Sequence, residues 1–306
     1  MEESHASHSR RAIVALSTGS LHSYGLYRVF GMAKEAGFEA IEVMVDGRWD
    51  TRHPEYLREL SRLFELPVAC LHSPFVSHVP GWHHSQKTRL KKTVAIAEAL
   101  GARTVVAHLP IRFARAFLHI PLWGQHSLHL SVQLPAVGDG EYNKFLCQGL
   151  ADFQRSTSVT IAVENMPYQQ LWGRAVSAYR MNTLDELETF AHLNFDTTHM
   201  GTAGIDVIAA YERLSDKIAH VHLSNYENGQ EHKLPTDGIL PLDRLLRCMH
   251  ANGYTGVISV EVEPGALEAG NERKARENLR KCYEFCREHF PRQSALVSSE
   301  TGVGAR

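Results

Sequence analysis

The chain has 306 residues, of which 43% are hydrophobic and 22% charged, and its 34 acidic and 32 basic side chains give a formal net charge of −2. This length and apolar content are typical of one large globular domain or two ordinary ones, and they exclude a disordered chain. The near-zero charge excludes a broad electrostatic surface for nucleic acid or membrane, and the lack of a long apolar run or a signal peptide predicts a cytoplasmic protein without a membrane segment.

Short β-branched apolar runs alternate with amphipathic stretches along the chain. The runs predict eight strands, at 12–16, 40–45, 68–72, 104–108, 160–164, 193–196, 218–222 and 257–262. Helical spacing of apolar residues predicts helices at 27–36, 54–64, 88–100, 184–191, 206–214, 242–251 and 273–289. Such alternation is typical of parallel strands joined by right-handed crossovers. We expect an α/β fold with one domain, a (β/α)8 TIM barrel over 12–290, rather than a doubly wound sheet, because no G-x-G-x-x-G follows the first strand.

Three segments depart from this alternation. Residues 109–140, after the fourth strand, are too many for an ordinary barrel connection and include several aromatic side chains, among them Trp123. We expect them to form a lid-like loop over the barrel mouth or a subunit contact. The N-terminus at 1–11 and the small, polar tail at 291–306 are predicted to be disordered.

Acidic residues and histidines occur at the ends of the predicted strands. The chain has 19 histidines, and the residues of interest are Glu42, His72, His108, Glu164, Asp196 with His199 three residues later, His222 and Glu261. Strand C-termini of a TIM barrel converge on one mouth. Because buried acids and imidazoles are costly without partners, a divalent cation that binds them all is the simplest explanation. Mixed imidazole and carboxylate donors favour zinc, manganese, iron or cobalt over calcium.

Two pairs of residues leave the strand register open. His220 and His222 point to the same face of their strand, as do Glu261 and Glu263. The member nearer the mouth is expected to be the ligand, so alternation alone does not choose between them.

The order of these motifs resembles one known superfamily. The pieces LHSPF, VVAHLP, VENMP, FDTTHMG, VHLSN, EHKLPTDG and ISVEVEP span nearly the whole barrel. Together they look like the xylose isomerase-like TIM-barrel superfamily, which includes sugar and sugar-phosphate isomerases and epimerases and the endonuclease IV-like (AP endonuclease family 2) enzymes. The resemblance favours His222 and Glu261 in the two open pairs.

The resemblance also implies metal ligands. Both branches imply a central metal, with the ligands Glu164, Asp196, His222 and Glu261. The endonuclease branch adds a second metal on His72, His108 and the shared Glu164, and a third on His199, His232 and an aspartate two residues before that histidine. This chain has Gln230 at the aspartate position, and an amide is a weaker ligand. We therefore expect one to three divalent ions per chain, with manganese or zinc as the metal.

The first functional hypothesis is a sugar or sugar-phosphate isomerase or epimerase. Metal would polarise the carbonyl of a small-molecule substrate, and Glu164 and Glu261 would move a proton between carbon atoms or faces. His199 would bond the oxygen on which negative charge develops. Trp123 in the lid would stack on the sugar, and Arg48, His232 or Lys233 would bind a phosphate.

The second hypothesis is a zinc phosphodiesterase of the endonuclease IV-like type. His72 and His108 favour it, because a one-metal isomerase has no evident need of either. Its substrate would be DNA or a small phosphodiester, although the chain has no concentrated basic stripe for DNA. A metal-stabilised binding module is a third possibility, but the ligands exceed those of a closed structural site. The sequence predicts no oligomeric state.

Overall fold

The computed structural model describes residues 11–75, 78–82, 84–121, 127–135, 140–171 and 173–292. The segments 1–11 and 291–306, which we predict to be disordered, fall outside these residues apart from Arg11, Pro291 and Arg292. Trp123 also lies outside them. Among the helices that are described, none is both long and apolar enough to cross a membrane.

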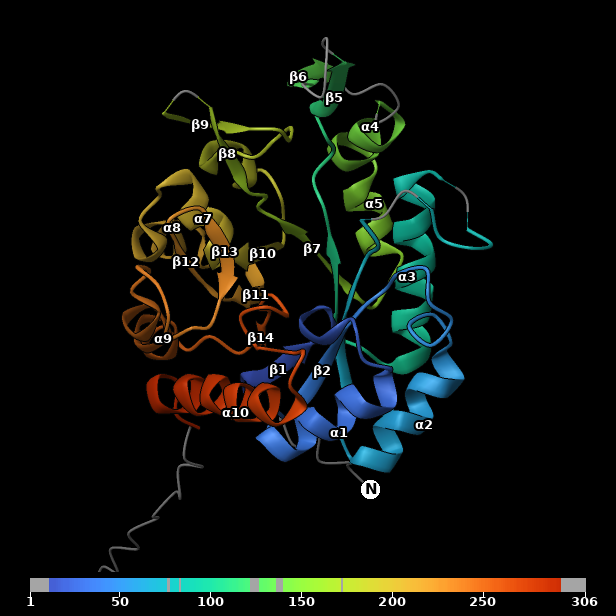
Figure 1. The fold of residues 1–306 in the computed structure, drawn as a ribbon. Helices are drawn as coiled ribbons and strands as arrows, with labels where there is room; N and C mark the ends of the chain where they lie inside the picture. Colours follow the sequence, from blue (N-terminus) through green and yellow to red (C-terminus); the bar gives the residue numbers. More distant parts are fainter. Residues whose placement is uncertain are drawn as a thin grey trace, which may run out of the picture.

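Eight parallel strands close into a barrel, so the predicted fold is confirmed. In chain order they are β1 (Ile13–Ser17), β2 (Ala40–Met44), β3 (Val68–His72), β4 (Thr104–Ala107), β7 (Thr160–Glu164), β10 (Leu193–Asp196), β11 (Ile218–Leu223) and β14 (Val257–Val260). Neighbours around the barrel follow the order β1-β14-β11-β10-β7-β4-β3-β2, with β1 and β2 paired to complete the circle. Figure 1 shows the strands at the centre with helices outside them.

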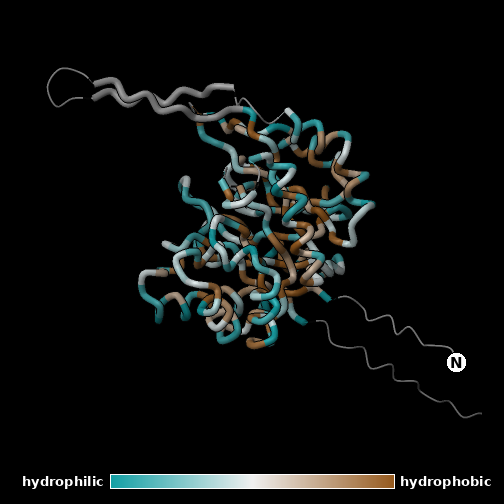
Figure 2. Tube along the Cα trace, turned by 90° about the vertical axis from the view of Figure 1, so that its right-hand side faces the viewer, coloured by the Kyte–Doolittle hydropathy of each residue, from teal (hydrophilic) through white to brown (hydrophobic). Residues whose placement is uncertain are grey.

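Amphipathic helices cover the outer face of the barrel. They are α1 (Leu26–Ala36), α2 (Pro54–Phe64), α3 (Gln86–Leu100), α4 (Gly140–Gln148), α5 (Leu150–Arg155), α6 (Leu184–Leu187), α7 (Thr197–Ala203), α8 (Val207–Leu214), α9 (Leu242–Ala251) and α10 (Glu272–His289), and a 3-10 turn, η1 (Thr18–Leu21), follows β1. Their apolar faces form one continuous core with the strands. In Figure 2 the hydrophobic segments gather inside the body of the molecule. Strands buried on both faces explain why the sequence shows continuous apolar runs.

Small side chains fill one end of the barrel interior. Ala15, Ala40, Ala69 and Val257 form a separate apolar cluster there. Polar residues with larger side chains lie further along β2 and near the end of the neighbouring strand β11, among them Glu42 and His222. This division places the charged groups toward the C-terminal ends of the strands.

The prediction of a loop over 109–140 is wrong in part. The strands β5 (Phe113–Pro121) and β6 (Ser127–Pro135) pair antiparallel over their full lengths, and α4 begins at Gly140. The second run, SLHLSVQLP, alternates polar and apolar residues, a strand pattern that outweighs the length argument for a loop.

Two more hairpins lie in connections of the barrel. They are β8 (Tyr168–Leu171) with β9 (Arg174–Ser177), and β12 (Asn225–Glu227) with β13 (Gln230–Lys233). The predicted helix 184–191 is shorter than expected, because α6 ends at Leu187. These differences lie in the connections and leave the barrel unchanged.

Candidate metal centre

Four side chains meet at the C-terminal ends of four adjacent strands. Glu164 ends β7, Asp196 ends β10, His222 lies near the end of β11, and Glu261 directly follows β14. These strands are consecutive around the barrel. All four residues are buried, and their ligand atoms lie within 4.8 Å of one another.

The imidazole of His222 is at the centre of this group. Its Nδ1 lies 2.8 Å from Glu164 Oε1, 2.8 Å from Glu261 Oε2 and 3.6 Å from Asp196 Oδ2. Asn194 supports Glu164 from below, because its Nδ2 donates to Glu164 Oε1 over 3.1 Å. The structure thus brings His222 and Glu261, rather than His220 and Glu263, into the central group.

The donor set of the central group fits a divalent cation. Three carboxylates and one imidazole nitrogen lie within 4.8 Å of one another, and Asp196 Oδ2 is buried without a hydrogen-bond partner among the described residues. Buried carboxylates need a compensating positive charge, and one imidazole offers at most one. Zinc and manganese both accept this mixture of nitrogen and oxygen ligands.

The charges of the central group respond to one another. Burial alone would disfavour ionisation, but the positive charge of His222 outweighs it and lowers the pKa of Glu261 to about 2. His222 and a hydrogen bond from His108 likewise hold the pKa of Glu164 well below its usual value. Burial opposes a charge on His222, yet Glu261, Glu42 and Glu164 raise its pKa well above the usual value. Both glutamates are therefore ionised at neutral pH, and His222 holds a proton that a metal must displace.

Adding a divalent metal to the metal-free protein is expected to raise its melting temperature more at about pH 8 than at about pH 6. The raised pKa of His222 contributes stability that is complete below the pKa of an unfolded histidine and is lost as the pH rises through the folded value. A bound cation replaces this proton. Below the folded pKa of His222, the apparent affinity for the metal therefore increases by up to about tenfold for each unit by which the pH is raised. Melting temperatures with and without zinc or manganese at both pH values measure the gain.

Scans with a chelator at both pH values separate this gain from the pH dependence of the metal-free protein. An equal gain at the two pH values would contradict competition between a proton and a metal at His222.

A second group shares Glu164 with the first. His108 Nε2 lies 3.0 Å and His72 Nε2 lies 3.6 Å from Glu164 Oε2. The Nδ1 of His72 lies 3.1 Å from the carbonyl oxygen of Ser73, which it can contact only as a donor. Burial opposes a charge on His72, but bonding to Glu164 raises its pKa, whereas burial lowers the pKa of His108. The atoms of this group also satisfy the spacing of a metal site.

A third group consists of Asp196, His199 and His232. Its ligand atoms also lie within 4.8 Å of one another. His199 Nδ1 lies 2.8 Å from the carbonyl oxygen of Asn165, which leaves Nε2 for the cavity. His232 has a backbone φ of 51°, a strained conformation for a residue other than glycine, and its ring meets that of His199 edge-on. Gln230, at the position where the resemblance implies an aspartate, is exposed.

These groups open into a cavity of about 610 Å³ at the barrel mouth. Its lining includes the metal-group residues His72, His108, Glu164, His199, His232 and Glu261. A set of apolar and aromatic lining residues from the connecting segments, which we call the outer wall, consists of Phe75, Leu109, Ile111, Met166 and Tyr179. Ile111 and Tyr179 pair as an isolated bridge, which ties the segment after β4 to the segment after β9. We did not predict this outer wall, because its residues come from connections that meet only in the closed barrel.

The structure does not bring two of the predicted substrate residues to this cavity. Arg48 bonds Asp46 over 2.8 Å and also donates to the carbonyl oxygens of His22 and Tyr24. Lys233 pairs with Glu227 over 2.7 Å and lines a separate surface hollow. Neither residue lines the cavity at the barrel mouth, and Trp123 lies outside the described residues. Arg48 and Lys233 therefore stabilise loops of the barrel.

Comparison with known proteins agrees with this architecture. A family model described as a xylose isomerase-like TIM barrel matches residues 30–285. An uncharacterized protein of Mycobacterium tuberculosis is 26% identical over 301 residues, which cover 91% of this chain and 98% of that protein.

Solved structures share the fold at lower identity. D-allulose 3-epimerase from Methylomonas sp., in complex with D-allulose, is 16% identical, with a TM-score of 0.62 and coverage of 92% of this chain and 98% of that chain. The IOLI protein, with a bound zinc atom, is 16% identical, with a TM-score of 0.63 and coverage of 91% and 99%. Because the family model matches most of the sequence, the chain belongs to the xylose isomerase-like TIM-barrel family.

Proposed function

We propose that this protein is a divalent-metal-dependent sugar epimerase or isomerase. One observation carries the proposal. The ionised carboxylates of Glu164 and Glu261 both line the cavity at the barrel mouth, and both contact the same nitrogen, Nδ1 of His222. They come from β7 and β14, on either side of β10 and β11. Two bases around one substrate position suit the removal and return of a proton at carbon.

The residues of the cavity then have distinct roles. Glu164, Asp196, His222 and Glu261 would hold a metal that polarises the substrate carbonyl and acidifies the neighbouring C–H bond. One of Glu164 and Glu261 would remove the proton as a carboxylate and later release it to solvent. The other, after taking a proton from solvent, would deliver it to the opposite face or to the adjacent carbon. With Nδ1 donating to the carbonyl oxygen of Asn165, His199 would present Nε2 to the substrate oxygen that gains negative charge.

The lining supports an uncharged sugar over a sugar phosphate. Among its described residues, Arg89 is the sole lysine or arginine, and Arg89 is buried and donates to the carbonyl oxygen of His84. The apolar side chains Phe75, Leu109 and Met166 offer a surface for the C–H groups of a sugar. We therefore propose a free ketose or aldose as the substrate.

A zinc phosphodiesterase is the second candidate. The observation that favours it is the pair His72 and His108 beside Glu164 Oε2, which would let Glu164 bridge two ions. Two ions so placed suit activation of water and stabilisation of a leaving oxygen.

Solvent deuterium exchange tests the proposed function. With zinc- or manganese-loaded protein in D2O, free ketohexoses and ketopentoses are expected to gain one deuterium at the carbon next to the carbonyl, because the proton passes through a glutamate that exchanges with solvent. Mass spectrometry and NMR locate the label. Phosphorylated ketoses serve as the comparison, and we expect slower exchange in them.

Hydrolysis of bis(p-nitrophenyl) phosphate by the same preparation is the matched assay for the second candidate. Hydrolysis without exchange in any sugar would replace the first proposal with the second.

A further inference from the structure

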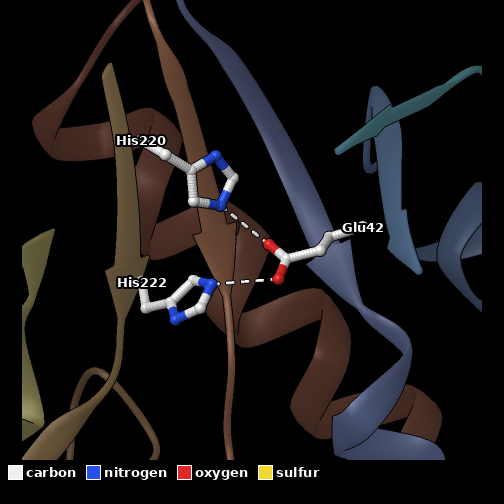
Figure 3. Close-up of side chains that lie close together, drawn as sticks. All are labelled: Glu42, His220 and His222. Carbon is white, nitrogen blue, oxygen red and sulfur yellow. Dashed lines mark hydrogen bonds and ion pairs between the residues drawn. The ribbon is translucent and has the colours of Figure 1, made fainter. Parts of the chain in front are cut away.

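We propose that Glu42 and His220 are positioning residues that hold His222 with Nδ1 toward the metal centre and Nε2 away from it. The inference rests on the proposed metal-dependent function, and it concerns residues outside the four-residue central group. Figure 3 shows the three side chains, with Glu42 reaching from β2 to both histidines of β11.

The geometry gives each oxygen of Glu42 one partner. Oε1 lies 2.9 Å from His222 Nε2, and Oε2 lies 2.7 Å from His220 Nε2. All three side chains have 0% exposure. Both carboxylate oxygens of Glu42 are thus engaged within the barrel interior.

The chemistry of these contacts fixes the proton of His222. An ionised carboxylate only accepts hydrogen bonds, so Nε2 of His222 must carry a hydrogen. A neutral imidazole has one N–H, and the lone pair is then on Nδ1, which faces Glu164, Asp196 and Glu261. Ligation through Nδ1 needs this tautomer and this ring orientation.

His220 acts one step further from the metal. Its Nε2 donates to Glu42 and keeps the carboxylate from turning toward another partner. The Nδ1 of His220 has no hydrogen-bond partner among the described residues. Within this part of the chain, the imidazole of His220 is therefore held by the bond from Nε2 to Glu42. Neither Glu42 nor His220 lines the cavity at the barrel mouth, and both are buried, so we place them behind the metal centre.

The same three residues do not need a metal of their own. Their ligand atoms are close enough for a metal site, but each Glu42 oxygen already lies at hydrogen-bond distance from one imidazole nitrogen. Protons therefore bridge these groups, which leaves Glu42 to support the metal centre.

The variant Glu42→Gln tests the inference. Its amide can accept from Nε2 or donate to it, so the tautomer of His222 is no longer fixed, and zinc affinity is expected to fall about 10- to 100-fold. Competition with a chromophoric chelator measures the affinity. In zinc-loaded protein with 15N-labelled histidine, the His222 Nε2–H signal of wild type is expected at low field, and it shifts upfield or disappears in the variant.

Glu39→Gln is the matched control. Glu39 lies three residues earlier and is also largely buried, but it pairs with Arg287 and Arg292 far from the cavity. This variant is expected to lose stability and keep the zinc affinity of wild type. If Glu42→Gln does not fold, His220→Leu replaces it, with a smaller loss of affinity and the same change in the NMR signal.

Wild-type affinity in folded Glu42→Gln, with an unchanged Nε2–H signal, would overturn the inference. Failure of the proposed function looks different. If the wild-type protein binds zinc but does not act on sugars, the ratio of zinc affinities between wild type and Glu42→Gln still tests the inference. If the protein binds no zinc, the Nε2–H signal of the metal-free form is the test.

Discussion

Replacing Glu164 by glutamine is expected to lower turnover by about three orders of magnitude or more while the barrel stays folded. The variant loses a proton acceptor and an anionic ligand at once, because Glu164 is both a proposed base and a member of the central group. Its carboxylate contacts His222 and His108. Glutamine keeps the shape of the side chain and its bond from Asn194, so the packing around β7 is preserved. Turnover, metal content and the melting temperature measured on one preparation test these expectations.

Glu263→Gln is the control for Glu164→Gln. Glu263 lines the same cavity, but it belongs to none of the groups that could hold a metal among the described residues. We expect turnover and metal content close to those of wild type. Retained turnover in Glu164→Gln would remove this carboxylate from the mechanism, and an unfolded Glu164→Gln would assign it a structural role.

The barrel and its central group could be predicted from the sequence. Parallel strands that are buried on both faces give short β-branched runs, and glycine breaks separate them from amphipathic helices. A polar residue at the end of such a run is conspicuous, as Glu164 and Asp196 are. The fold then carries these residues to one mouth without further information, because all strand C-termini of a TIM barrel face the same way.

The outer wall and the support of the metal centre could not be predicted in this way. Glu42 is predicted among the acidic residues at strand ends, but in the structure it lies in the middle of β2, and its contact with His222 spans 180 residues of sequence across the barrel interior. Local periodicity carries no information on a contact of this kind, which depends on the register of all the strands between. Arg48 illustrates a prediction that local sequence suggests but the structure does not support. A cation near a strand end suggests a phosphate site, but the guanidinium of Arg48 is paired with Asp46, two residues earlier.

Protein purified without chelators is expected to contain about one equivalent of zinc or manganese, and His72→Ala is expected to retain it. The central group offers three carboxylates and one imidazole, whereas the second group offers two histidines and a carboxylate that it shares. The neighbouring Glu164 carboxylate also raises the pKa of His72 against the effect of burial, so a second metal would compete with a proton for this ring. Inductively coupled plasma mass spectrometry gives the metal content per chain.

His22→Ala is the control for His72→Ala, since His22 lines the cavity but joins none of the candidate metal groups among the described residues. Two or more zinc ions in wild type, with one lost in His72→Ala and none lost in His22→Ala, would contradict a one-metal enzyme. Glu164 would then bridge two ions, as the zinc phosphodiesterase requires. The sugar assays and this metal count therefore discriminate between the two chemistries independently, because one follows the substrate and the other follows the second group of ligands.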